Sequence, residues 1–501
     1  MKKLLKRFWR SSGLGLRWLA KKELPCTEWI LLRLWPEHRF HLILFLFRNS
    51  HINKAHSLLT GFVPANHSEA LWLERICSFY DMISGRHQWQ LPEAESLLLP
   101  VFNQNVLMAL HNSAPYDFAG YWYRSENILM QLRNWGVAIH CATRPGYPWD
   151  LQKHRGLPVT QADRVGGVVF QRLPAHAAPY KQGSDFRYVK EYSRQLAELA
   201  TQQKATVIHG HSNYLNGLAA IEAARLAGVA SVYEARGFWH LTRLSKEPDF
   251  ANTDAFLYEE NMEKLALREA DRVVTLSQAM KSLIISWGIN ADKIHVIPNA
   301  VDARRFQPQP SDMELREQWP VSGFIVGFIG SITPYEGLLD LTAAVKRLRA
   351  QGIAISLVIA GAGPYESELR KAINGCDYIY YAGAIPHSDV QRWYASFDCC
   401  AYPRRNDAVC RYVPPMKVLE AMAMEKPVVV SDLPPLTEMV EHGVTGLICR
   451  PDNADSLAEC LEKLLEKQLA MRLATAAREW AENNRTWEQN GKQYVQMYST
   501  I

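Results

Sequence analysis

A single carboxylate in an otherwise apolar stretch is the feature of this sequence whose chemistry is simplest to interpret. The stretch PPMKVLEAMAMEKPVVVSD spans residues 414–432, and Glu420 begins a helical segment whose next four residues are apolar. If this helix starts at the end of a sheet, the carboxylate can accept hydrogen bonds from hydroxyl groups of a ligand. The alternative is that Glu420 only stabilises the first turn of its helix through the helix dipole.

Short apolar runs that alternate with helical stretches would position such a group. In the first half the strand candidates lie at 105–111, 137–144, 205–211, 231–237 and 271–277, and in the second half at 324–330, 355–361, 378–384, 398–403 and 427–432. This alternation predicts right-handed βαβ units and a parallel sheet in each half. The segment 298–315, rich in proline and polar residues, is interpreted as a linker. Two doubly wound domains joined in this way leave a cleft at the carboxyl ends of their strands.

Length and charge restrict the class of protein. With 501 residues, the chain exceeds the roughly 250 to 300 residues at which one hydrophobic core stops growing, so two or more domains are expected. The net charge of +5 is too small to indicate nucleic acid as a partner. The nine cysteines show no paired spacing with histidines. The sequence therefore predicts neither a zinc site nor a disulfide framework, and no metal or other cofactor.

The N-terminal region is basic and apolar at once. Residues 1–22 carry eight Lys and Arg and no acidic residue, and Leu4, Leu5, Phe8 and Trp9 fall on one side of a helix. The later apolar run WILLRLWPEHRFHLILFLF is broken by charges and a proline, so it predicts neither a signal peptide nor a membrane span. We expect residues 1–50 to bind an anionic membrane surface peripherally. The alternatives are a basic helix packed on the other domains and a disordered tail.

The segment around Glu420 resembles the signature of the retaining family 4 glycosyltransferases of the GT-B fold. The similarity runs from Asn105 to Trp487, and its order and spacing make it specific. In the first half it is carried by HNSAPYDFAGYWYRS (111–125), TRPGYPWD (143–150), HGHSNYLNGLAA (209–220), YEARGFWHLTR (233–243) and IPNAVDARRF (297–306). In the second half it is carried by GFIGSITPYEGLLDL (327–341), AGAGP (360–364), YAGAIPHSDV (381–390), YPRR (402–405) and HGVTGLI (442–448).

For the first half, the resemblance implies a reaction centre at the strand ends. Gly120 would lie against it, because a residue without a side chain lets a sugar and its phosphates approach backbone N–H groups, although a plain turn glycine is the alternative. His211, Glu234 and Arg236 are the implied catalytic residues, since His can bind hydroxyl groups and Arg can bind phosphate. A buried ion pair between Glu234 and Arg236 is the alternative. His209 is the better candidate for a core histidine.

For the second half, the resemblance implies the site of a nucleotide diphosphate sugar, the donor. Gly330 and Ser331 would face the diphosphate, and the backbone around Ile385 would hold the base. Arg404 and Arg405 are the nearby cations, with a solvated surface position as the alternative for Arg405. The remaining implied donor-binding residues share the turn of helix around Glu420: Lys417, Val418, Leu419 and Glu420.

Two positions depart from the family pattern. The paired glutamates of the family would fall at Glu420 and at position 412, which is Tyr412 here. The usual lysine before the glycine of the first loop is Glu336, followed by Gly337. The missing lysine leaves Arg404, Arg405 and Lys417 to bind phosphate.

The resemblance implies an α/β protein of the GT-B fold, with two Rossmann-like parallel-sheet domains facing across a cleft and an N-terminal helical extension. We expect a helical accessory region at 1–103, an acceptor-side domain at 104–305, a donor domain at 306–480, and a C-terminal helix at 481–501 packing back on the N-terminal domain. The predicted function is metal-independent, retaining transfer of a sugar to a glycan or lipid-linked acceptor in cell-surface polysaccharide synthesis. The predicted location is the cytoplasm, at the inner face of the cell membrane. The alternatives are an inactive GT-B-like binding or assembly protein and a GT-B epimerase or phosphorylase.

Overall fold

The computed structural model of the chain describes residues 39–92, 103–118, 120–175 and 183–501. The basic segment 1–22, for which a membrane-binding helix was predicted, lies outside these ranges. The described chain forms two compact units, one built from residues 1–91, 175–191 and 249–261 and the other from the remainder. The larger unit contains two α/β domains, each with its own parallel sheet.

The sheet of the N-terminal α/β domain has the strand order β3-β4-β2-β1-β5-β6-β7-β8. All neighbouring strands run parallel except β3 and β4, which form an antiparallel pair. The strands are β1 (Asn105–Leu110), β2 (Ala138–Thr143), β3 (Ala162–Val165), β4 (Val168–Arg172), β5 (Val207–His211), β6 (Ala230–Glu234), β7 (Arg272–Thr275) and β8 (Ile294–Val296). Strands β5 and β6 are buried at every residue, as expected for a parallel sheet covered on both faces.

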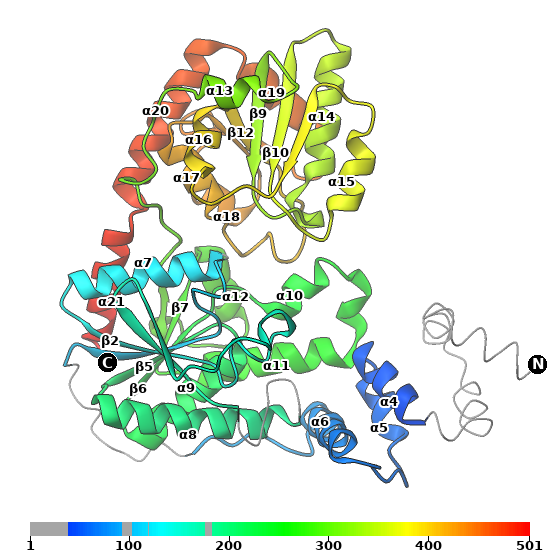
Figure 1. Cartoon of the computed structure of the whole chain (residues 1–501), viewed down its shortest axis with the longest axis vertical. Coiled ribbons are helices and arrows are strands. Elements are labelled where there is room, and N and C mark those ends of the chain that lie inside the picture. Colours follow the sequence, from blue (N-terminus) through cyan, green and yellow to red (C-terminus); the bar gives the residue numbers. More distant parts are fainter. Residues whose placement is uncertain (1–38, 93–102, 119, 176–182) are drawn as a thin grey trace, which may run out of the picture. The chain divides into compact units, whose positions relative to one another are not determined.

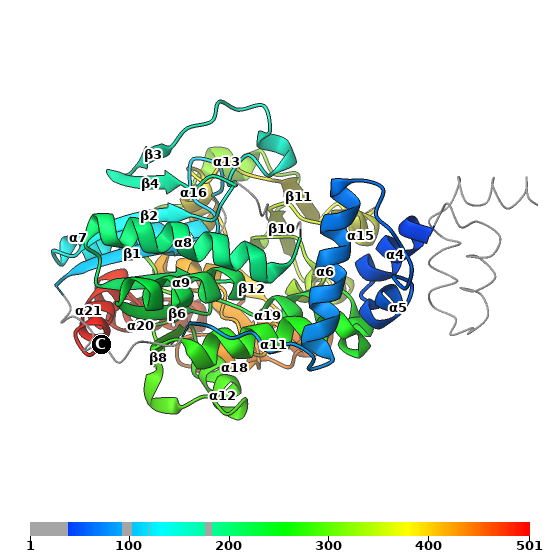
Figure 2. The same ribbon diagram turned by 90° about the horizontal axis from the view of Figure 1, so that it is seen from below.

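Helices cover both faces of this sheet (Figures 1 and 2). The helices of the domain are α7 (Gly120–Asn134), α8 (Asp185–Gln203), α9 (Tyr214–Ala227), α10 (Trp239–Leu244), α11 (Asp254–Glu269) and α12 (Gln278–Ser286). Helix α9 has sharp sequence boundaries, because the Asn213 side chain accepts a hydrogen bond from Leu215 N–H and Gly228 ends the helix in the left-handed conformation. Its apolar surface lies against β5 and β6, and so fixes the carboxyl ends of these two strands.

The sheet of the C-terminal α/β domain is entirely parallel, with the order β11-β10-β9-β12-β13-β14. Its strands are β9 (Phe324–Ile329), β10 (Ile355–Ala360), β11 (Ile379–Gly383), β12 (Cys399–Tyr402), β13 (Val428–Ser431) and β14 (Leu447–Cys449). Its helices are α13 (Met313–Glu317), α14 (Leu338–Ala350), α15 (Glu366–Ile373), α16 (Val390–Ala395), α17 (Lys417–Ala423), α18 (Pro434–Thr437) and α19 (Ala454–Lys463).

Each sheet reverses its winding direction at one strand. In the N-terminal domain β1 lies between β2 and β5, and in the C-terminal domain β9 lies between β10 and β12. Connections leave these strands toward opposite faces, which opens a crevice at their carboxyl ends. The crevices therefore lie beyond Leu110 in one domain and beyond Ile329 in the other.

Two C-terminal helices return the chain from the second domain to the first. Helix α20 (Lys467–Asn484) packs on α17, and helix α21 (Trp487–Tyr498) packs on α7. A capping box at Thr486 and Gln489 starts α21, and Val301 pairs there with Thr486. The predicted linker at 298–315 is thus held in place at its first residues, and its end forms the start of α13.

The smaller unit contains three N-terminal helices, α4 (Arg39–Arg48), α5 (Ile52–Ser57) and α6 (His67–Ile83). It also includes the beginnings of α8 and α11, so it recruits segments that the predicted boundary at residue 103 had placed in the N-terminal α/β domain. The reason is local, because Asp185 in α8 accepts hydrogen bonds from Arg75 and from Tyr258 of α11, and Phe79 stacks on Tyr258.

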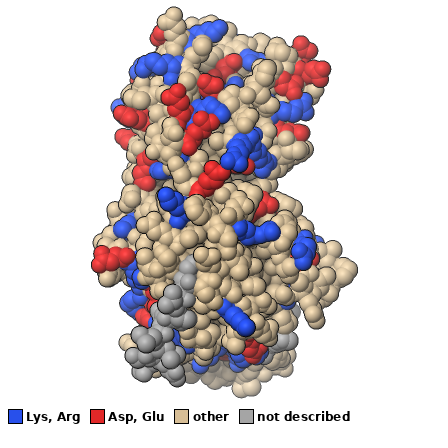
Figure 3. Space-filling model, turned by 90° about the vertical axis from the view of Figure 1, so that its left-hand side faces the viewer, with Lys and Arg blue, Asp and Glu red and all other residues tan. Residues whose placement is uncertain are grey.

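The described surface mixes both signs of charge. On the face in Figure 3, basic and acidic side chains are interspersed over the upper part, in agreement with the small net charge. None of the helices formed by the described residues combines the length and the apolar character that a membrane span requires.

Candidate active site

Glycines line the crevice of the C-terminal domain at the ends of β9 and β10. A Cβ atom on Gly361 would lie 1.8 Å from the carbonyl oxygen of Gly330, and one on Gly363 would lie 2.3 Å from that of Ile332. Side chains at these positions would collide with neighbouring backbone, so only glycine lets the two loops meet. Gly330 is also beside a cation, because its hypothetical Cβ would lie 2.8 Å from Lys417 Nζ. The crevice thus combines exposed backbone with a positive charge.

Three charged side chains meet in this crevice. Lys417 Nζ lies 2.6 Å from Glu336 Oε2, and Arg404 Nη2 lies 3.5 Å from Glu336 Oε1. Arg404 also donates a hydrogen bond to the carbonyl oxygen of Val413, and Lys417 lies over the ring of Phe328. Two cations face one carboxylate, so the cluster keeps a net positive charge.

Burial and mutual attraction set the protonation of this cluster. Burial alone would raise the pKa of Glu336, but the charges of Lys417 and Arg404 lower it below its ordinary value. Burial lowers the pKa of Lys417, an effect that Glu336 opposes. Burial would also lower the pKa of Arg404, but Glu336 raises it above the ordinary value. The carboxylate is therefore ionised at neutral pH.

The other predicted donor-binding residues lie around this cluster in different environments. Ser331 is exposed at the end of β9, and Ile385 is half-buried in the loop after β11. Val418 and Leu419 are fully buried in the first turn of α17, so their side chains pack in the core. The Arg405 guanidinium is half exposed and pairs with Asp452 at 3.1 Å, which is the surface environment given as its alternative.

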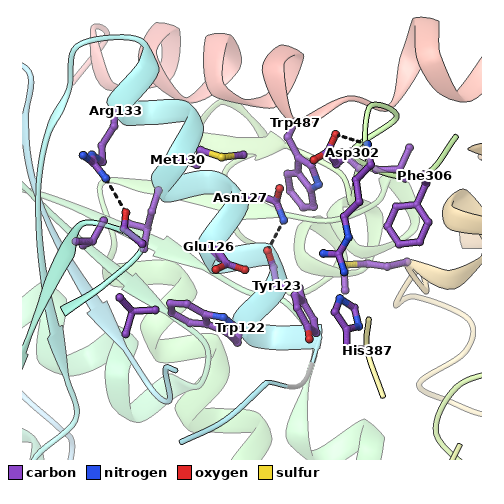
Figure 4. A pocket seen from close by; sticks show the side chains of 18 of the residues that line it. Trp122, Tyr123, Glu126, Asn127, Met130, Arg133, Asp302, Phe306, His387 and Trp487 are labelled. Atoms are coloured by element: carbon purple, nitrogen blue, oxygen red, sulfur yellow. Dashed lines mark hydrogen bonds between the residues drawn. The ribbon is translucent and has the colours of Figure 1, made fainter. Parts of the chain in front are cut away.

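Glu420 lies one turn after Lys417 on α17 and lines a pocket of about 290 Å³. Its Oε2 accepts a hydrogen bond of 3.0 Å from the Tyr394 hydroxyl, and burial raises its pKa. Figure 4 shows the side of this pocket formed by α7, where Tyr123 stacks on His387 with ring centroids 4.2 Å apart. Residues of both α/β domains therefore line the pocket. Among the described residues, Tyr394 is the hydrogen-bond partner of the Glu420 carboxylate, which leaves capacity for a polar ligand.

Gly120, the first residue of α7, is exposed and faces the C-terminal domain. A Cβ atom there would lie 3.2 Å from the end of the Met416 side chain, directly before Lys417. The start of α7 at Gly120 therefore lies near the start of α17, where Lys417 is located.

The predicted catalytic residues of the N-terminal domain form one buried network. Glu234 is fully buried, and its Oε1 accepts hydrogen bonds from Arg124 Nε at 2.9 Å and Arg236 Nε at 2.6 Å. Its Oε2 accepts a hydrogen bond of 2.5 Å from Tyr494 of α21 and lies 3.5 Å from His209 Nε2. Burial alone would raise the pKa of Glu234, but Arg124 and Arg236 hold it well below its ordinary value. The buried ion pair that was the alternative for Glu234 is therefore present.

Arg236 connects this network to the first turns of α7. Its Nη1 donates to the Tyr121 carbonyl oxygen at 2.9 Å and to Ser125 Oγ at 2.7 Å, and both residues belong to the first turns of α7. Its Nη2 contacts His211 Nδ1, while His211 Nε2 contacts the Met108 sulfur at 3.1 Å. Both ring nitrogens of His211 thus point into the domain, and burial lowers its pKa well below the ordinary value. The structure brings His211, Glu234 and Arg236 together, and their catalytic roles stay a prediction.

The structure contains one group of metal-ligand type among the described residues, His209, His211 and Glu234. Its environment does not suit a cation, because the Glu234 oxygens already accept three hydrogen bonds and two arginines lie beside them.

Several residues of these clusters were missed in the sequence. Arg124 donates from all its nitrogens, reaching Glu234, the carbonyl oxygens of Ile297 and Pro298, and Asn299 Oδ1. A signal existed, because Arg124 shares the buried stripe of α7 with residues four and seven positions later. Tyr394, Tyr494 and His387 gave no comparable signal, since their partners lie far away in the sequence.

Two parallel-sheet α/β domains, with a glycine-lined, positively charged crevice in the second, define the GT-B class of proteins. Comparison with known families agrees. The profile described as "Glycosyl transferases group 1" matches residues 323–467, and the profile described as "Glycosyl transferase 4-like domain" matches residues 119–300. The chain belongs to the group 1 glycosyltransferases, family 4 of the GT-B fold, and the predicted family and fold class are confirmed.

One similar relative is the GDP-mannose-dependent alpha-(1-6)-phosphatidylinositol monomannoside mannosyltransferase of Mycobacterium tuberculosis, which is 28% identical over 226 residues. The match covers 44% of this chain and 59% of that protein. Among solved structures, sucrose-phosphate synthase from Thermosynechococcus elongatus has a TM-score of 0.66 and 19% identity, covering 79% of this chain and 98% of that one. The Anabaena protein HepE in complex with UDP has a TM-score of 0.59 and 21% identity, covering 79% of this chain and all of the other.

Proposed function

We propose that this protein transfers a sugar from a nucleotide diphosphate sugar to an acceptor, with retention of the anomeric configuration and without a metal ion. The observation that carries the proposal is the position of Lys417 and Arg404 beside Gly330, at the strand where the sheet reverses its winding. A diphosphate needs positive charge and close backbone approach, and this crevice offers both. The relatives support a donor of this class, since one is named GDP-mannose-dependent and another is solved with UDP.

In the proposed reaction the bond between the sugar carbon and the diphosphate oxygen breaks while the acceptor oxygen forms a bond to the same carbon. Attack comes from the face that the diphosphate leaves, and the leaving oxygen takes the proton of the acceptor hydroxyl. Lys417 and Arg404 stabilise the negative charge that grows on the diphosphate. A front-face route fits the burial of Glu234, because a carboxylate saturated by two arginines and a tyrosine is a poor nucleophile.

Within this proposal the buried network acts on the site through α7. Arg236 holds the first turns of α7, and the helix begins at Gly120, next to Met416 and Lys417. The Glu420 carboxylate binds hydroxyl groups of the donor, in the pocket that Tyr123 and His387 also line. Removing this carboxylate in Glu420→Ala is expected to cost about 2 to 4 kcal/mol of transition-state stabilisation.

The acceptor is proposed to be a glycan or a lipid-linked glycan of cell-surface polysaccharide synthesis, at the cytoplasmic face of the cell membrane. The relative named as a phosphatidylinositol mannoside mannosyltransferase supports a membrane-borne acceptor. The basic N-terminal residues 1–22 support peripheral membrane binding. In that case the full chain sediments with anionic liposomes at low salt and is released at high salt, whereas a chain starting at Asn105 stays in the supernatant.

The test is a transfer assay with a panel of nucleotide sugars and lipid-linked or oligosaccharide acceptors, run with and without EDTA. We expect transfer that survives EDTA and yields a product whose anomeric configuration, read by NMR, equals that of the donor. An inverted product would exclude retention, and full loss of turnover with recovery on adding Mn²⁺ or Mg²⁺ would exclude metal independence. Binding of a donor without turnover would instead support the inactive, GT-B-like binding protein.

A further inference from the structure

We propose that Glu336 is a built-in counter-anion of the diphosphate site, which weakens the binding of the donor and of the released nucleoside diphosphate. The inference rests on the proposed function, and adds to it a residue that sets how tightly the site holds an anion. It starts from a buried carboxylate that lies between the two cations of the crevice, Lys417 and Arg404.

The backbone keeps Glu336 at the site. The next residue, Gly337, has a φ of +71°, and a Cβ atom there would lie 1.8 Å from the carbonyl oxygen of Pro403. The loop that carries Glu336 is therefore pressed against the loop that carries Arg404, where only glycine fits. A ligand that enters the crevice consequently meets the carboxylate as a fixed part of the wall.

The carboxylate also lies close enough to repel a bound phosphate. Glu336 Oε2 is 2.6 Å from Lys417 Nζ, so a phosphate oxygen bonded to Lys417 lies within about 5.5 Å of it. At such a distance, and with an effective dielectric constant of about 20, repulsion between two charges changes binding by at least about tenfold.

The negative charge of Glu336 is not needed to hold the two cations in place. Arg404 is also fixed by the Val413 carbonyl oxygen and lies over the Tyr335 ring, and Lys417 lies over the rings of Phe328 and Tyr402. A neutral glutamine at position 336 would keep the size of the side chain and one acceptor oxygen, while removing the negative charge.

Hydrogen-bonding capacity for a ligand is left over in the cluster. Arg404 is buried, and its Nε has no hydrogen-bond partner within the part of the chain that the structure describes. A buried donor without a partner is costly, and a phosphate oxygen would satisfy it. The site is thus built to attract an anion, while Glu336 limits the strength of that attraction.

The experiment compares the full-length protein with Glu336→Gln by titration calorimetry against UDP, GDP, ADP and dTDP at two salt concentrations. We expect Glu336→Gln to bind the preferred nucleoside diphosphate at least about tenfold more tightly, with a steeper loss of affinity at high salt. The matched control is Glu482→Gln, which removes the same charge from a partly buried ion pair with Arg478 on α20 and should bind like the parent protein.

Equal or weaker binding by a folded Glu336→Gln would overturn the proposal while leaving the transferase function intact. If neither protein binds any of the four diphosphates, the proposed function and this inference both fail. Circular dichroism and thermal melting verify the fold, and Glu336→Ala, which also removes the charge, replaces the glutamine variant if that variant does not fold.

Discussion

The two α/β domains each bury a glutamate beside two cations, but the two clusters differ in how completely their hydrogen-bonding groups are paired. Around Glu234 in the N-terminal domain, the carboxylate accepts three short hydrogen bonds, and Arg124 donates from every nitrogen. Around Glu336 in the C-terminal domain, one contact is long, at 3.5 Å, and Arg404 Nε lacks a partner among the described residues. The comparison teaches that two clusters with similar residues can differ in how much hydrogen-bonding capacity they leave for a ligand.

The largest expected effect is on stability, in the cluster of Glu234, Arg124 and Arg236. Glu234→Gln should lower the free energy of unfolding by about 3 to 5 kcal/mol, because it leaves Arg124 and Arg236 buried without their counter-charge. Glu336→Gln should cost less, since its cluster is less saturated and Lys417 keeps some exposure to water. Urea unfolding of both variants beside the parent protein measures the two losses, and equal losses would break the comparison.

The next largest effect is expected on activity, in the cluster of Glu336, Lys417 and Arg404. Lys417→Met should lower the rate of a single turnover by about 10² to 10³, or about 2.7 to 4 kcal/mol, because it removes a charge that stabilises the leaving diphosphate. Arg404→Ala should likewise lower kcat more than Glu336→Ala does. Single-turnover rates test the first statement, and steady-state kcat at saturating donor tests the second. Small, similar effects from all three variants would assign the diphosphate to backbone N–H groups.

A smaller effect is expected from the last partner of Glu234. Tyr494→Phe removes the hydrogen bond to Glu234 Oε2 and the one from Arg124 Nη2, with little change in volume. The free energy of unfolding should fall by about 1.5 to 3 kcal/mol, because hydrogen bonds to charged groups are the strong ones. Tyr80→Phe, in the N-terminal helical unit, is the control for losing a tyrosine hydroxyl, and an equal loss there would contradict the role of Tyr494.

The smallest effect is a dependence of stability on pH. Arg124 and Arg236 hold the pKa of Glu234 well below the ordinary value of 4.5, so Glu234 stabilises the folded protein fully above pH 4.5. That contribution should shrink as the pH falls below 4.5, by at most about 1.4 kcal/mol for each pH unit. The difference in unfolding free energy between the parent protein and Glu234→Gln should therefore become smaller between pH 5 and pH 3. A constant difference would exclude the lowered pKa of Glu234.

The sequence predicted most of the two sheets, since their central strands are apolar runs bounded by loop residues. The strand candidates at 105–111 and 324–330, for example, became β1 and β9. It did not predict β3, β4, β8 or β14, which are three to five residues long and lie at the outer part of each sheet. Strands β7, β12 and β13 are equally short, but the outer strands are buried at only some of their residues and so lack the continuous buried run that marks a central strand.

The candidate sites were predictable only in part, for a different physical reason. The strand-end positions of Gly330 and Arg404 follow from the alternation of strands and helices, whereas the donor-site role of Glu420 was implied by the family resemblance. The pairing of Lys417 with Glu336 depends on how two loops, about 80 positions apart, fold together, and no local pattern encodes it. The same holds for Tyr494, which reaches Glu234 across 260 positions.

The separation of Tyr494 from Glu234 in the sequence affects the order in which the parts of the protein become available during synthesis. The ribosome makes β6, with Glu234, before the whole C-terminal α/β domain, and it makes α21 after that domain. Until α21 emerges, Glu234 and Arg124 lack the tyrosine hydroxyl that joins them in the finished protein. Of the two α/β domains, the one translated first is thus the last to receive all its parts, and a nascent chain stalled before residue 487 lacks the Tyr494 hydroxyl that joins Glu234 and Arg124.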